Sequence, residues 1–185
     1  MNTSNSNNKT VKTHKLVYSW YALYTRSRQE KKVYKELTDQ SIEAYLPLEI
    51  KIRQWSDRKK KVEEPMIRSY VFVKSSEKEY YDILNTFGAV RYVTFEGKAA
   101  PIPEWQIDAM KKMLNHNLPH HYSDERFLKG EQISITDGPL KGFDGEVVND
   151  SAGKQKVIIR VANIGYSLVI NSPLAFVKKV MNEKE

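Results

Sequence analysis

The chain has 185 residues and a formal net charge of +7, with 30 Lys and Arg residues against 23 Asp and Glu residues. Apolar residues make up 40% of it and aromatic residues 11%, which is enough to build packed cores and excludes wholesale disorder. Cysteine is absent, which excludes disulfide scaffolds, cysteine-ligated zinc and thiol catalysis.

The excess positive charge is confined to one part of the chain. Residues 1–114 carry 21 basic and 14 acidic side chains, whereas residues 115–185 carry nine of each. A basic front and a neutral back indicate two modules with different partners.

The first fifteen residues are rich in Asn, Ser, Thr and Lys, and we expect them to form a disordered tail. They contain no apolar segment of a secretory signal, and no run in the chain approaches the roughly 18 apolar residues of a membrane span. We therefore expect a cytoplasmic location. Residues 17–24, which are aromatic and branched, then predict a strand covered on both faces.

An amphipathic helix is predicted next. Ser27 and Glu30 have the spacing of a capping box, and Val33 and Leu37 recur at helical spacing. The pattern ends near residue 40, where Asp and Gln follow the last apolar position.

A basic hairpin or loop is predicted to protrude after this helix. Residues 42–52 are predicted to be extended, with Pro47 marking an edge or bend. Residues 51–61 then carry six basic side chains and one acidic side chain around Trp55. We interpret Trp55 as an anchor of the hairpin to its domain, with stacking on a base as the alternative.

The following segment predicts two strands, over residues 69–74 and 90–95, on either side of a helix. Ser76 and Glu79 form a second capping-box pattern. The inward face of this helix is predicted from Tyr80, Ile83, Leu84 and Phe87, and that of a third helix, ending near residue 114, from Ile107, Met110 and Leu114. This order predicts an α+β domain over residues 16–114, with three helices on a mostly antiparallel sheet.

The back of the chain has a different pattern. Residues 115–127 are polar and lack periodicity, which predicts a linker. Five short alternating or branched runs follow within residues 128–182, separated by turn signals such as Asp137–Pro139. They predict a small all-β barrel.

These motifs together resemble one protein family. Trp20–Tyr24, Tyr70–Val73 and Pro101–Pro103 are similar to the N-terminal domain of NusG-type transcription factors. Lys129–Val147 is similar to the KOW motif that closes those proteins, which implies an SH3-like barrel. The residues Leu23–Gln29 are most similar to the specialised RfaH-type and UpxY-type paralogues.

The resemblance implies a transcription elongation or antitermination factor that is a monomer, carries no cofactor and is not an enzyme. Members of the family dock on the clamp helices of the RNA polymerase largest subunit and suppress pausing or termination. Specialised members act on long operons such as those for capsular polysaccharide synthesis. The residues matching the docking patch are Leu23, Tyr24, Ile67 and Tyr70.

The resemblance also implies contact with non-template or upstream DNA. Lys and Arg clusters neutralise phosphate, and the net charge is +4 over residues 26–35 and +5 over residues 51–61. The candidate nucleic-acid residues are Arg26, Arg28, Lys32, Arg53, Arg58, Lys59, Lys60 and Lys61.

The back domain of NusG-type factors recruits a ribosomal protein or Rho, and the candidate residues here are Phe143, Ile164 and Tyr166. The corresponding RfaH domain can form an α-hairpin, but the branched residues 157–159 and 167–170 predict strands.

The alternative is a KOW-domain protein that binds RNA or the ribosome, with its contacts in the neutral back of the chain. His116, His120 and His121 lack the spacing and carboxylate support of a metal site, and no catalytic constellation is recognised.

Overall fold

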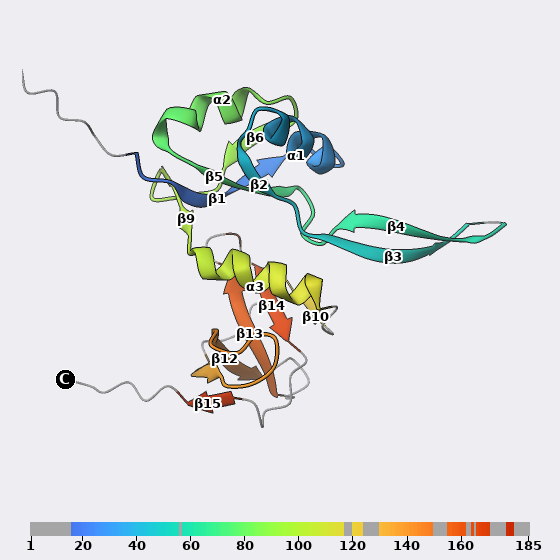
Figure 1. Cartoon of the computed structure of the whole chain (residues 1–185), viewed down its shortest axis with the longest axis vertical. Helices are drawn as coiled ribbons and strands as arrows, with labels where there is room; N and C mark the ends of the chain where they lie inside the picture. The colour runs from blue at the N-terminus through green and yellow to red at the C-terminus, as the bar shows by residue number, and fades with distance from the viewer. Residues whose placement is uncertain are drawn as a thin grey trace, which may run out of the picture.

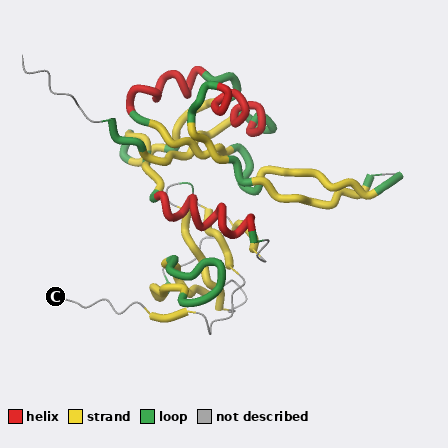
Figure 2. The backbone as a smooth tube through the Cα atoms, viewed as in Figure 1, coloured by secondary structure: helices red, strands yellow, loops and turns green. Residues whose placement is uncertain are grey.

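The computed structural model describes residues 16–55, 57–116, 120–123, 130–149, 155–161, 164, 166–170 and 177–179. Within them the chain forms a mixed α/β structure, with one sheet near the start, a long separate hairpin and a second sheet near the end (Figures 1 and 2). The predicted tail, residues 1–15, lies outside the described residues. Among the described residues, no helix is both long and apolar enough to cross a membrane.

The first sheet is built around the strand predicted at residues 17–24. This strand is β1 (Ser19–Thr25), which pairs antiparallel with β5 (Tyr70–Ser75) on one side. On the other side it pairs with β6 (Ala89–Tyr92) and β9 (Pro101–Ile102). The short β2 (Glu43–Tyr45) pairs with the outer side of β5. The predicted antiparallel sheet is therefore confirmed.

Helices cover both faces of this sheet, as the continuous apolar run of its central strand predicts. On one face, α1 (Glu30–Asp39) and α2 (Tyr80–Asn85) bury a cluster that includes Leu23, Val33 and Ile83. On the other face lies α3 (Glu104–Asn115), whose Ile107 and Met110 join a cluster with Trp20, Ile67, Phe72 and Ile102.

The first predicted capping box is wrong, whereas the second is confirmed. The helix α1 begins at Glu30 after Gln29, which makes no side-chain cap, and Arg28 has a left-handed φ of 62°. The Glu30 carboxylate instead accepts a hydrogen bond of 2.7 Å from the backbone N–H of Ser69. The Glu79 carboxylate accepts the Ser76 N–H at 2.8 Å, which opens the 3-10 helix η1 (Glu77–Glu79) before α2.

The basic segment forms a β-hairpin that projects from the first sheet (Figure 1). Its strands are β3 (Leu48–Gln54) and β4 (Lys59–Pro65), paired over their whole length. The predicted anchoring role of Trp55 is wrong, because Trp55 lies at the far end of the hairpin and its side chain is 51% exposed. A second small hairpin pairs β7 (Thr94–Phe95) with β8 (Lys98–Ala99), so the strand predicted at residues 90–95 is divided between β6 and β7.

The second sheet is also antiparallel and has the order β10-β14-β13-β12-β11-β15. Its strands are β10 (His120–Ser123), β11 (Glu131–Ile135), β12 (Asp144–Asn149), β13 (Gln155–Val161), β14 (Tyr166–Ile170) and β15 (Val177–Lys179). Five of these strands lie where the sequence predicts them. The strand β10 lies within the segment predicted to be a linker. The sequence prediction misses it because its residues are polar, and its pairing with β14 is a tertiary contact that leaves no local pattern.

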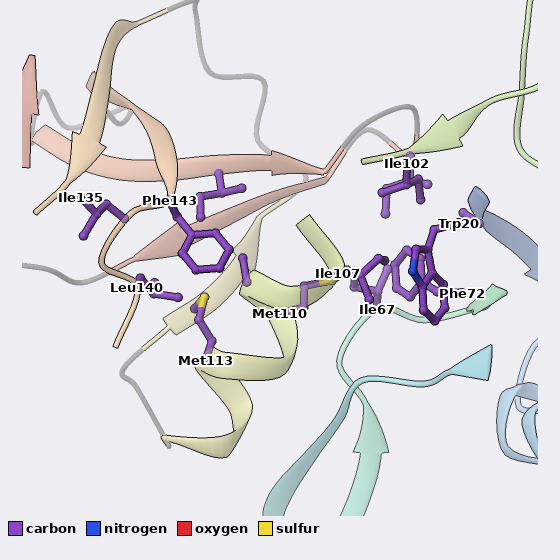
Figure 3. Packing of buried hydrophobic residues seen from close by; sticks show 14 of the residues in the cluster. Trp20, Ile67, Phe72, Ile102, Ile107, Met110, Met113, Ile135, Leu140 and Phe143 are labelled. Carbon is purple, nitrogen blue, oxygen red and sulfur yellow. The ribbon is translucent and has the colours of Figure 1, made fainter. Parts of the chain in front are cut away.

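One buried cluster connects the two sheets through α3 (Figures 1 and 3). Toward the second sheet, Met113 of α3 is buried in the same cluster as Ile135, Leu140 and Phe143. Met113 therefore takes the inward position that the sequence predicts for Leu114, which is only partly buried. The helix α3 thus shares its apolar side chains between two neighbours.

Candidate functional site

The two basic residues of β3, Lys51 and Arg53, are already paired with carboxylates. Arg53 donates from Nε and Nη2 to the two carboxylate oxygens of Glu64, over 2.8 and 3.0 Å. The hydrogen bond from Arg53 holds the pKa of Glu64 below its usual value. Lys51 lies 3.1 Å from the carboxylate of Glu49. Arg53 is therefore less available to phosphate than the sequence alone predicts.

The tip of the hairpin carries the cations that remain available. Lys59, Lys60 and Lys61 are exposed, and no ion pair to them is found among the described residues. The Lys60 ammonium lies 5.4 Å from the centroid of the Trp55 ring, and Arg58 lies 3.9 Å from Asp57. Because successive side chains of a strand alternate between faces, these lysines place positive charge on both faces of the tip.

The start of α1 forms a second basic cluster beside the hairpin. Arg26, Arg28 and Lys32 are exposed, and within the described part of the chain they make no ion pair. Lys31 bridges the helix to the hairpin, with its Nζ 3.7 Å from a Glu63 carboxylate oxygen. A hollow of about 480 Å³ lies between the start of α1 and the hairpin, and it is lined by Ser27, Arg28, Glu30, Lys31, Arg53, Glu64, Pro65 and Arg68. The structure thus brings the two predicted basic segments together around one hollow.

Of the four residues predicted for polymerase docking, two reach the surface. Tyr24 and Tyr70 are partly exposed and form an edge-to-face pair with ring centroids 5.4 Å apart. The Arg91 guanidinium lies 5.9 Å from the Tyr24 ring. Leu23 and Ile67 have no exposed surface, since Leu23 packs under α1 and α2 and Ile67 under α3. In this conformation their placement is explained by core packing.

The residues predicted for partner binding in the back of the chain lie against α3. Phe143 is 8% exposed, its ring centroid is 6.5 Å from that of Trp105, and the Lys112 ammonium lies 4.6 Å from it. Ile164 is buried in the same cluster. Tyr166 begins β14, and its side chain lies outside the described part of the structure. The face predicted for a protein partner is therefore occupied by the chain's own helix.

One ion pair joins the two central strands of the second sheet. Arg160 donates from Nε and Nη2 to the two carboxylate oxygens of Glu146, each over 3.0 Å, and the backbone N–H of Gly130 adds a bond of 3.1 Å. Partial burial raises the pKa of Glu146, but these hydrogen bonds outweigh that effect, so its pKa lies below the usual value. Glu146 thus takes up the positive charge of Arg160.

Three exposed side chains near these clusters are absent from the candidate site residues predicted from the sequence. Arg68 lines the hollow, Arg91 lies over Tyr24, and Phe87 is 63% exposed with the Arg26 guanidinium 5.9 Å from its ring centroid. Isolated Arg residues carry no local pattern, so Arg68 and Arg91 give no signal in sequence. Phe87 gives a misleading one, because it continues the apolar spacing of α2.

The histidines predicted not to form a metal site are only partly described. His116 is exposed just after the last residue of α3, whereas the side chains of His120 and His121 lie outside the described part. Over the residues that are described, no group of three His, Cys, Asp or Glu side chains could hold a metal ion.

Comparison with known proteins identifies related sequences. The family model described as "Transcription termination factor nusG" matches residues 18–111, just over half of the chain. The transcription termination/antitermination protein NusG of Halalkalibacterium halodurans is 22% identical over 176 residues, covering 88% of this chain and 98% of that protein. NusG of Staphylococcus epidermidis is 28% identical over 160 residues, covering 79% and 87%. A solved structure described as "Domain interaction in Thermotoga maritima NusG" aligns with a TM-score of 0.46 and 20% identity, over 89% of this chain and 98% of that one.

Proposed function

The chain belongs to the NusG family of transcription factors, and on this premise we propose that it binds transcribing RNA polymerase and suppresses pausing or termination. The observation that carries the proposal is that two groups of exposed cations, at the hairpin tip and at the start of α1, have no ion-pair partner among the described residues, on a chain that matches the family. Cations without an internal carboxylate partner are available to phosphate, and DNA is the phosphate polymer that surrounds a transcribing polymerase.

The polymerase contact is proposed to involve the exposed aromatic pair rather than all four predicted residues. Tyr24 and Tyr70 are partly exposed and form an edge-to-face pair, with Arg91 beside Tyr24. Aromatic and Arg side chains are enriched where protein interfaces bind most strongly. We propose the clamp helices of the largest subunit as the partner of this patch, and cytoplasmic monomers as the form that acts.

The DNA contact is proposed to be divided between the hairpin tip and the start of α1. Lys59, Lys60 and Lys61 would contact upstream duplex, because the hairpin projects them away from the sheet (Figure 1). Arg26 and Arg28 would contact the non-template strand. Arg53 would contribute little, because Glu64 neutralises it.

The second sheet is proposed to be a KOW-type, SH3-like barrel spanning residues 128–182, joined to a polymerase-binding domain spanning residues 16–114. Its partner would be a ribosomal protein or Rho. The competing proposal of an RNA-binding KOW protein is less supported, because Phe143 and Ile164 are buried against α3 and Arg160 is paired with Glu146. A long operon such as that for capsular polysaccharide is the proposed target.

The test is single-round transcription by purified bacterial RNA polymerase on a template with a pause and a terminator. The full chain is expected to bind the elongation complex and to increase readthrough. Replacing Lys59, Lys60 and Lys61 by Ala should make the affinity for the elongation complex less dependent on salt. The slope of log affinity against log salt concentration should become shallower by about 2 to 3. A matched triple variant of exposed lysines elsewhere, at Lys78, Lys98 and Lys141, should leave it unchanged. Absence of polymerase binding, with readthrough unaltered, would refute the proposed function.

A further inference from the structure

Phe87 is a large apolar side chain that the fold leaves in solvent. The apolar spacing of α2 predicts it to be inward, but α2 ends at Asn85, and Thr86 takes an extended ψ of 129° that turns the chain outward. The Phe87 side chain is 63% exposed as a result. A single exposed aromatic ring is common on protein surfaces, so its surroundings decide whether it has a role.

The backbone that carries Phe87 is fixed against the start of α1. The Gly88 carbonyl accepts a hydrogen bond of 2.8 Å from the Arg26 N–H, and the Glu36 carboxylate accepts the Phe87 N–H at 3.5 Å. Gly88 has a φ of +94°, and a Cβ there would lie 3.0 Å from the Cβ of Gln29. Glycine is therefore required at this position, and the exposed ring is held at a defined place.

The ring lies beside cations that have no carboxylate partner in the described structure. The Arg26 guanidinium is 5.9 Å from the Phe87 ring centroid, and Arg28 is exposed two residues further on. A planar guanidinium stacks on an aromatic face and still directs its N–H groups to phosphate. The arrangement places an exposed aromatic ring beside an arginine at the start of α1 that can bind phosphate.

We propose that Phe87 stacks on a base of single-stranded nucleic acid, with Arg26 and Arg28 contacting the phosphates next to that base. A single strand is required because both faces of a base are covered within a duplex, whereas proteins that bind single strands combine aromatic stacking with a basic track. This inference rests on the proposed function only in taking nucleic acid as the partner of the basic clusters.

The test measures binding of the full chain to a fluorescein-labelled, mixed-sequence 12-nucleotide DNA, as a single strand and as a duplex. Phe87→Ala is expected to weaken single-strand binding about 5-fold to 150-fold, the range that corresponds to base–aromatic stacking of about 1–3 kcal/mol. Phe87→Trp should restore it, with tryptophan emission quenched by the DNA. Phe87→Leu, which keeps apolar volume without an aromatic face, should be almost as weak as Phe87→Ala.

The matched control is Phe95→Ala, since Phe95 is also exposed (65%) but lies in the β7–β8 hairpin. It should bind the single strand as the unaltered chain does, and duplex binding should not distinguish any of these variants. The inference is overturned if the unaltered chain does not bind the single strand, if Phe87→Ala binds it equally well, or if Phe87→Leu restores binding. Loss of polymerase binding by Phe87→Ala with unchanged oligonucleotide affinity would assign the ring to a protein contact, which also overturns the inference. None of these results depends on the readthrough assay, so the proposed function succeeds or fails separately.

Discussion

Replacing Phe143 by Ala tests whether the second sheet is held against α3 in solution. Only 8% of the side chain is exposed, and it lies in a cluster with Met113 and Leu140, beside the Trp105 ring. Truncating a buried Phe to Ala costs about 3–5 kcal/mol, through lost transfer free energy and the cavity left behind. The sheet and the helix can move closer after the truncation, so the lower end, about 3 kcal/mol, is expected. That value lowers the folded-to-unfolded ratio about 150-fold.

The assay is urea unfolding followed by both far-UV circular dichroism and tryptophan emission. Two probes are needed because a chain with two sheets need not unfold in one step, and a free energy is defined only for each cooperative transition. Phe95→Ala removes the same atoms from an exposed site and should change the free energy of unfolding by less than about 0.5 kcal/mol. Amide exchange in α3 should also become faster in Phe143→Ala. If Phe143→Ala unfolds like Phe95→Ala and leaves exchange in α3 unchanged, the described contact does not form in solution and the reasoning is refuted.

Three further predictions follow from other parts of the structure. Gly88→Ala should lower the free energy of unfolding by at least about 1 kcal/mol more than Gly97→Ala, because both glycines have positive φ but only Gly88 has neighbours within 4 Å; equal losses in urea unfolding would contradict this. Glu146→Gln should cost about 1 kcal/mol at pH 7, a value reduced for solvent around the pair. The pKa of Glu146 is lowered in the folded state, so the stability that Glu146 contributes is present above the unfolded pKa of about 4.3 and is lost as pH falls through the folded pKa. Between pH 7 and pH 3, the free energy of unfolding of the Gln variant should therefore decline less than that of the unaltered chain. Glu64→Gln should release Arg53 and raise the salt-dependence slope of duplex binding by up to about 1, and a lower slope would show that Arg53 does not reach DNA.

The sequence predicts most strands and the approximate position of each helix because these depend on local apolar spacing. The prediction at Glu30 fails because the same carboxylate can cap a helix or bond to a distant turn, and the N–H of Ser69, just before β5, is the partner it binds in the fold. Phe87 fails for a related reason, since its spacing fits α2 but the helix stops two residues earlier. For both Glu30 and Phe87, local spacing fits two alternative structures equally well, and a tertiary contact or a turn determines which one forms.

The candidate site was predicted by charge, and the structure adds information that charge cannot contain. Lys59 and Arg53 are equivalent in a count of basic residues, yet Arg53 is held by Glu64 on the partner strand of the hairpin, and Lys59 makes no ion pair in the described structure. Burial adds the same kind of information for Leu23 and Ile67, which family resemblance places at an interface and the fold places inside. For α3, the choice of Met113 over Leu114 depends on the second sheet, which no pattern within the helix reveals.

The reach of the projecting hairpin and the faces on which it presents its side chains are coupled through the alternation of side chains along each strand. Each strand has seven residues and extends about 24 Å at 3.4 Å per residue. Removing one facing residue from each strand would shorten the reach by about 3.4 Å and would also turn every more distant side chain to the opposite face. Removing two from each strand would shorten it by about 7 Å and return each lysine to its original face. The distance over which this chain presents its cations can therefore change between relatives in steps of two residues per strand, without any change in the sheet from which the hairpin projects.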